Sequence, residues 1–127
     1  MFQNVRQQGT VCAVLTQRLP RGPFWSAKGD SEGVPRPTER ARKALRDGMS
    51  DGEIFMLRVA WAIWTGGGVP SCKLDLGALI FTLDNRNLAM VGNLFVALSA
   101  PGSQAIERWI RQYDERPGAT VSRDVAG

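Results

Sequence analysis

Histidine is absent from this chain of 127 residues, and cysteine and tyrosine are scarce, with two copies and one copy. Without histidine the chain lacks the commonest general base and the commonest metal ligand of proteins. The two cysteines, Cys12 and Cys72, lie far apart and form no CxxC motif, so they indicate neither a zinc site nor a disulfide framework. We therefore expect buried thiols, no metal, no cofactor and no enzymatic activity.

Long uninterrupted apolar runs are missing as well. Arg58 interrupts the run over residues 54–64, and Asp84 and Arg86 interrupt residues 76–100. A membrane-spanning helix needs about 20 consecutive apolar residues. The first residues, MFQNVRQQGT, also lack the basic stretch and apolar region of a secretory signal. These absences predict a cytoplasmic protein that has no membrane partner.

Glycine-rich and acidic positions offer no clear catalytic motif. A phosphate-binding loop follows the pattern GxxxxGK[ST] or GxGxxG and comes after a strand. The three glycines at 66–68 instead follow a predicted helix, and Lys73 has neither a second glycine nor a Ser or Thr beside it. The carboxylate of Asp84 stands where a helix is predicted to start, so capping explains it without catalysis.

Positive charge is concentrated near the N-terminus. The net charge is +4, and residues 1–48 contain nine Lys or Arg against four Asp or Glu. Four of the seven prolines also lie there, and proline fixes the backbone and removes a hydrogen-bond donor. We therefore predict an irregular or disordered segment over residues 1–36. Within it, TVCAVLTQRL (residues 10–19) is compatible with a short strand or with an isolated helical turn.

A short basic helix is predicted over residues 38–47. Thr38 can cap it, Glu39 suits its positive N-terminal end, and Gly48 can end it. The apolar stripe of this helix is narrow, so we expect weak docking onto the rest of the chain. A solvated surface helix is one interpretation; the other is a basic arm that contacts nucleic-acid phosphates through Arg40, Arg42, Lys43 and Arg46.

The sequence predicts an all-α domain over residues 37–116 and a flexible tail over 117–127. Beyond the basic helix, the apolar periodicity indicates an orthogonal or up-down bundle of four helices, over about 51–65, 73–83, 86–99 and 103–114. Met49 stands directly before the first of these helices, so translation starting there would yield a chain that begins with the bundle.

The helix over residues 51–65 is predicted to lie at the centre of the bundle. Ser50 and Glu53 have the spacing of a capping box, which places the first helical residue at Asp51. Almost all later positions are apolar, which is typical of a helix surrounded by protein. Arg58 and Thr65 are the exceptions, and Arg58 would either pair with an internal carboxylate such as Asp75 or Asp84 or extend its charged tip to solvent.

The later helices show apolar stripes. Between 73 and 83 the stripe is Leu76, Leu79, Ile80 and Leu83, although a strand through ALIFTL is an alternative. Ser71 or Asp75 can cap this helix, and Asp84 can cap the next. The following stripes are Leu88, Val91, Leu94, Phe95 and Leu98, and then Ile106, Trp109, Ile110 and Tyr113.

Exclusion of other classes favours a small protein-interaction or accessory module. A core of about 65 residues is small, so binding a protein partner or forming a homodimer would cover surplus apolar surface. Trp61 and Trp64 are expected in the core, whereas Trp109 and Tyr113 on the last helix are the candidates for an exposed interface. The alternative function is association with nucleic acid through residues 36–46. A helix-turn-helix in residues 74–98 is disfavoured, because its second helix lacks basic side chains beyond Arg86.

Overall fold

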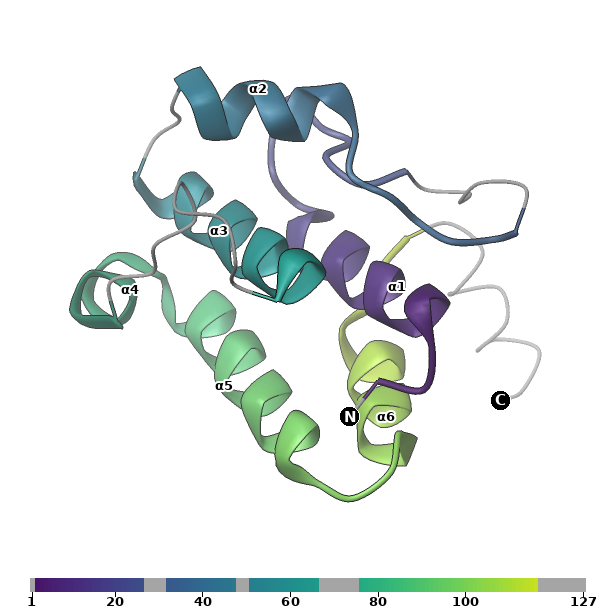
Figure 1. Cartoon of the computed structure of the whole chain (residues 1–127). Coiled ribbons are helices and arrows are strands. Elements are labelled where there is room, and N and C mark those ends of the chain that lie inside the picture. The colour runs from purple at the N-terminus through teal and green to yellow at the C-terminus, as the bar shows by residue number, and fades with distance from the viewer. Residues whose placement is uncertain (1, 27–31, 48–50, 67–75, 117–127) are drawn as a thin grey trace.

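The computed structural model describes residues 2–26, 32–47, 51–66 and 76–116, and each regular element in these ranges is a helix (Figure 1). This confirms the all-α prediction. None of the helices in the described ranges is long and apolar enough to cross a membrane. The helices are α1 (Val5–Thr16), α2 (Glu39–Asp47), α3 (Asp51–Thr65), α4 (Leu76–Thr82), α5 (Asn85–Ser99) and α6 (Gln104–Tyr113). The five predicted helices correspond to α2 to α6, with ends that differ by three residues or fewer.

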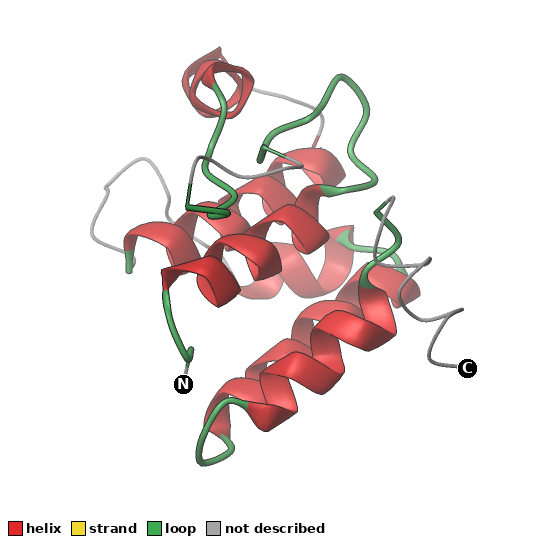
Figure 2. Ribbon diagram, turned by 90° about the vertical axis from the view of Figure 1, so that its right-hand side faces the viewer, coloured by secondary structure: helices red, strands yellow, loops and turns green. Residues whose placement is uncertain are grey.

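The helices pack as two pairs with two further helices at the edges. The most extensive contact joins α1 to α3, and the next joins α5 to α6. Figure 2 shows α5 and α6 running at an angle below the α1–α3 pair. In Figure 1, α2 lies across the top of α3, and α4 lies at the side of the molecule next to the start of α5.

Helix α1 was not predicted, and the expectation that residues 1–36 are irregular is wrong for Val5–Thr16. The apolar residues of α1 from Val11 to Leu15 are all 4% exposed or less. Because α3 and α6 both pack on α1, the helix has no continuous polar face. Of the two interpretations of residues 10–19, the helical one is correct, but the helix is three turns long and belongs to the core.

Polar side chains hold α1 in register with its neighbours. Three glutamines donate across the fold: Gln7 Nε2 to Glu107 Oε1 at 2.8 Å, Gln8 Nε2 to the carbonyl oxygen of Ile63 at 2.8 Å, and Gln17 Nε2 to that of Tyr113 at 2.7 Å. The last two acceptors are at the C-terminal ends of α3 and α6, where carbonyl groups lack partners within their own helix. These bonds therefore fix the helix ends as well as α1.

Helix α3 lies at the centre, as predicted. Met56, Leu57, Val59 and Ala60 are each 1% exposed or less. The helix ends at Gly66, whose φ of 71° is the left-handed conformation expected of a C-cap glycine. Of the other predicted caps and glycines of this region, those at 50, 67, 68, 71 and 75 lie outside what the structure describes, and for Glu53 only the helical backbone is described.

The chain between α1 and α2 is irregular but packed. Phe24 and Trp25 are 3% and 2% exposed, and the amide of Thr38 donates to the carbonyl of Phe24 at 2.9 Å. The Trp25 ring meets the rings of Trp61 and Trp64 edge-on, with centroids 6.1 and 6.4 Å apart. Trp61 and Trp64 are partly buried against the core, which agrees with their prediction as core residues.

Arg58 is the one charged residue of α3 after Glu53. Its side chain is half-buried, and its Cζ atom lies 6.0 Å from the centroid of the Phe55 ring. Its buried Nε has no hydrogen-bond partner within the described ranges. Asp75, one of the two carboxylates considered as a partner, lies outside those ranges.

Two glycines inside helices provide a matched test of the packing around α1. A Cβ atom at Gly9 would lie 2.2 Å from the carbonyl oxygen of Pro35, whereas a Cβ at Gly92 would meet nothing within 4 Å. Gly9→Ala should therefore destabilise the fold by about 2 kcal/mol or more, because a backbone atom must move. Gly92→Ala should stabilise α5 by up to about 1 kcal/mol through helix propensity. Urea denaturation of both variants at one protein concentration measures the difference, and equal changes would contradict this packing.

Candidate functional site

Trp109 does not belong to an exposed patch, which corrects the predicted interface. The Trp109 side chain is 3% exposed, and its Nε1 donates to the carbonyl of Met90 at 2.9 Å. Tyr113 is half-buried beside it, with ring centroids 5.3 Å apart, and its hydroxyl accepts from Asn93 Nδ2 at 2.6 Å. The two aromatic residues therefore join α6 to α5.

The predicted phosphate contacts are brought together on α2. Arg40, Arg42, Lys43 and Arg46 are all exposed, while Ala41 between them is fully buried, so α2 docks on the core more firmly than expected. Arg40 Nη1 donates to the carbonyls of Arg21 and Gly22 at 3.0 and 2.7 Å. Arg46 forms an ion pair with Asp47, with 3.6 Å between Nε and Oδ1. The Thr38 hydroxyl, expected to cap this helix, donates to the carbonyl of Pro23 at 2.8 Å.

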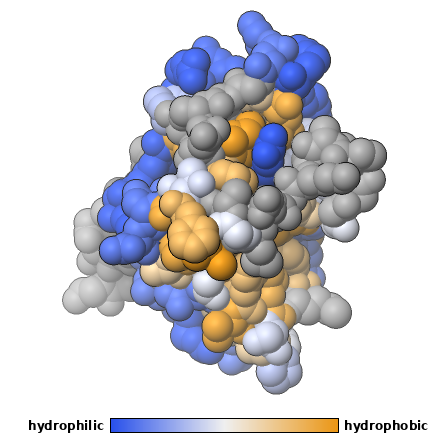
Figure 3. Space-filling model, turned by 90° about the vertical axis from the view of Figure 1, so that its left-hand side faces the viewer, coloured by the Kyte–Doolittle hydropathy of each residue, from blue (hydrophilic) through white to orange (hydrophobic). Residues whose placement is uncertain are grey.

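Helices α4 and α5 carry a surface that we name the uncharged face, made of Ile80, Phe81, Phe95 and Val96. These side chains are 50%, 90%, 46% and 69% exposed. The sequence from 76 to 105 contains only two charged residues, Asp84 and Arg86. Figure 3 shows apolar atoms gathered over this side of the molecule, with hydrophilic residues above them. An apolar surface of this kind usually marks a place where another molecule binds.

The exposure of this face follows from how α5 packs. Its buried residues are Met90, Val91, Leu94 and Ala97, and Asp84 caps the helix through Oδ1, which accepts from the Asn87 amide at 2.8 Å, as predicted. Phe95, part of the apolar stripe predicted for α5, is about half exposed, and so is Ile80 from the stripe of α4. These two members of the stripes therefore lie at the surface and not in the core.

A second feature is a group of three charged residues that we name the arginine cluster: Arg18, Arg86 and Glu115. Arg18 contacts the Glu115 carboxylate through Nε at 2.8 Å and through Nη2 at 2.6 Å, and Arg86 Nη2 contacts the same carboxylate. The three side chains are 50%, 51% and 43% exposed. The two guanidinium groups hold the pKa of Glu115 below its ordinary value, chiefly through the hydrogen bond from Arg18.

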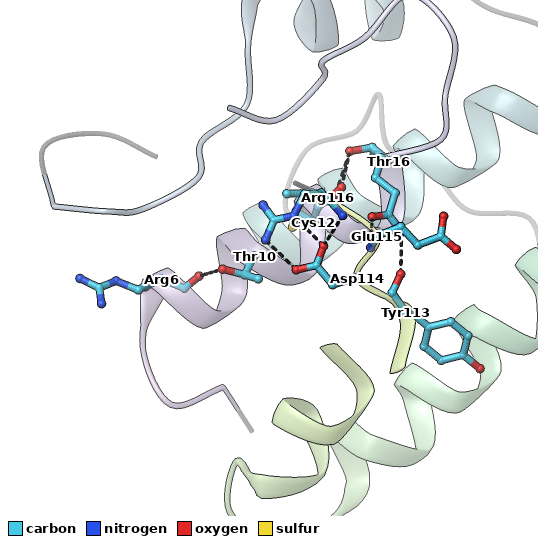
Figure 4. Close-up of polar contacts among 10 residues, drawn as sticks. Arg6, Thr10, Cys12, Thr16, Tyr113, Asp114, Glu115 and Arg116 are labelled. Atoms are coloured by element: carbon cyan, nitrogen blue, oxygen red, sulfur yellow. Dashed lines mark hydrogen bonds and ion pairs between the residues drawn. The ribbon is translucent and has the colours of Figure 1, made fainter. Parts of the chain in front are cut away.

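Residues on either side of Glu115 fix its position after α6. Asp114 is 3% exposed, and its carboxylate accepts hydrogen bonds from Nε and Nη2 of Arg116, at 2.9 and 3.0 Å, as Figure 4 shows. The Glu115 amide donates to Gln17 Oε1 at 2.9 Å. The backbone that carries Glu115 is therefore attached to the end of α1.

The arginine cluster borders a cleft of about 410 Å³ between the end of α1 and the corner of α4 and α5. Arg18 and Arg86 both line the cleft, and Glu115 does not. The apolar part of its lining consists of Val14, Leu15, Leu19, Pro20, Met56, Leu83 and Met90. Its volume lies within the range of about 300 to 1,000 Å³ that is usual for small-molecule sites. No local sequence pattern indicates this cleft, because its lining comes from segments distant in the chain.

Cys12 is a buried thiol, as predicted. Its Sγ donates to the carbonyl of Ala60 on α3 at 3.2 Å. Burial raises the pKa of this thiol far above its ordinary value, so the reactive thiolate does not form at neutral pH. Cys72 lies outside the described residues.

No family model, curated protein or solved structure matches this chain. The described residues carry three surfaces of different chemistry: the basic side of α2, the uncharged face, and the cleft beside the arginine cluster.

The arginine cluster predicts a pH-dependent contribution to stability. The pKa of Glu115 is lowered from its ordinary value of 4.5, so its stabilising effect is complete above that pH and is lost as the pH falls through the lower, folded-state pKa. Glu115→Gln should reduce the free energy of unfolding by at most about 1 kcal/mol at pH 7, because exposed ion pairs contribute little. Urea denaturation of the wild-type chain and the variant at pH 7 and pH 3 measures this loss. A loss in the free energy of unfolding that is as large at pH 3 as at pH 7 would contradict the prediction.

Proposed function

We propose that this chain is a cytoplasmic, non-catalytic protein-interaction module that forms a homodimer through the uncharged face. The observation that carries the proposal is the exposure of Phe81, at 90%, and Val96, at 69%, on two helices whose only charged residue is Arg86. Covering a large apolar side chain is favourable by roughly 1.5 to 3 kcal/mol when it becomes fully buried. Several such side chains on adjacent helices therefore supply a driving force for association.

The charge distribution favours a second copy of the chain as the molecule that covers the uncharged face. The chain has a net charge of +4, so two copies repel each other wherever their basic surfaces approach. The uncharged face avoids this repulsion, since Asp84 and Arg86 are the only charged residues from 76 to 105 and have opposite signs. In a two-fold dimer the same face is presented by both copies, and no charge on α4 or along α5 beyond Arg86 has to leave water.

Substitutions on the face test the dimer. In sedimentation equilibrium, the chain should form a dimer at micromolar concentration, and Phe81→Ser or Val96→Ser should raise its dissociation constant by about tenfold or more. Both side chains are mostly in water, so circular dichroism and the urea midpoint of the dissociated chain should change little.

Val5→Ser is the matched control, because Val5 is an exposed apolar residue, at 43%, on α1. It should leave the dissociation constant unchanged. A chain that stays monomeric at about 100 μM would overturn self-association. Binding of the monomer to neutral phospholipid vesicles, lost on Phe81→Ser, would assign the face to a lipid surface instead.

A second candidate function, association with nucleic acid, is favoured by one observation. The four cationic side chains of α2 are all exposed on a helix that is docked through Ala41. Cations held at the surface in this way can replace the counterions of a phosphate backbone without reading its sequence. The uncharged face plays no part in this function, so the two candidates are tested separately.

A charge-matched pair of variants tests phosphate binding. Replacing Arg42 and Lys43 with alanine should weaken binding to duplex DNA and lower the slope of log affinity against log salt by about two, one for each lost contact. The control replaces Arg108 and Arg111 on α6, which are also exposed, and removes the same charge. Fluorescence anisotropy at several salt concentrations measures both. An equal loss of affinity for the two pairs of substitutions would show that DNA binding depends only on net charge. Affinity that does not change with salt would rule out phosphate binding by the basic arm.

A further inference from the structure

The cleft beside the arginine cluster combines an apolar interior with two cations at its border. Arg18 and Arg86 line it together with seven apolar residues from α1, α3, α4–α5 and the turn after α1. Asp84, which also lines it, uses Oδ1 to cap α5. The positive groups at the border are therefore the two guanidinium groups, about half exposed and accessible from solvent.

Both guanidinium groups are directed at one carboxylate that comes from outside the cleft. Glu115 accepts from Arg18 and from Arg86, and it is 43% exposed. A carboxylate of a ligand could replace it on the same donors, after which Glu115 would return to water at little cost. The exchange conserves the charge at the two arginines, and the apolar part of the ligand would leave water by entering the cleft.

We propose that the cleft binds a small amphipathic carboxylate, with Glu115 occupying the arginines when no ligand is present. The carboxylate head contacts Arg18 and Arg86, and the apolar body lies against the more accessible apolar lining residues, such as Leu19 and Pro20. A neutral molecule of the same shape gains only the apolar contact. Glu115 is therefore an internal competitor that sets how tightly the ligand binds.

Titration calorimetry with n-decanoate, kept below its micelle concentration, tests the proposal. Decanoate should bind the wild-type chain, and Glu115→Gln should tighten its binding by about fivefold, because the competing carboxylate is removed. Replacing Arg18 and Arg86 with glutamine should weaken the binding by about tenfold or more, because both charge-assisted hydrogen bonds are lost. The matched control replaces Arg108 and Arg111 with glutamine and should leave the affinity unchanged.

Decanol is the probe without a charge. It should bind more weakly than decanoate, and none of these substitutions should change its affinity. Equal binding of decanol and decanoate would overturn the proposal and reduce the cleft to an apolar surface. Failure of Glu115→Gln to bind decanoate would also overturn it. The same titration on Phe81→Ser separates this result from dimer formation, since Phe81 does not line the cleft.

Discussion

The packing of α1 against α3 is the contact on which the other parts of the fold depend. Helix α3 is apolar on most of its surface, so it needs neighbours on several sides, and α1 supplies the largest of them. The two backbones approach closely enough for the Cys12 thiol to reach the carbonyl of Ala60. About one turn before Cys12, Gly9 allows the chain near Pro35 to lie directly on α1. The path between α1 and α2, and with it the position of α2, follows from that approach.

Much of this fold could be predicted from local patterns, and α1 shows where they fail. Helices α3, α5 and α6 were predicted because a capping box, a capping Asp84 and an amphipathic stripe mark them in turn. In α1 the residues from Val11 to Leu15 are buried on every side, so no period of 3.6 residues is visible. Gly9 and the β-branched residues also lower its helix propensity. The glutamines that attach α1 to other helices resemble ordinary surface residues, because their partners are carbonyls and a carboxylate far away in the sequence.

The candidate sites were harder to predict for a related reason. Trp109 fits an apolar stripe whether the neighbour is the core or a partner, and its burial together with the hydrogen bond from its indole to Met90 identifies the core. Phe95 fits the same kind of pattern and yet faces water. The arginine cluster joins residues 18, 86 and 115, which no spacing rule connects. What the sequence does show directly is the absence of charge along α4 and most of α5, and that absence is the property on which the proposed dimer depends.

The positions of charge and apolar surface also limit how far association can proceed. An interface related by a two-fold axis uses the same face on both copies and closes once two chains have met. Further chains would have to approach other parts of the surface, among them α2, where four cationic side chains are exposed. Figure 1 shows α2 and α5 on different sides of the molecule, so the repulsive surface stays outside the contact. A net charge of +4 therefore opposes growth beyond the proposed dimer, whose contact uses helices with a single charged residue, Arg86.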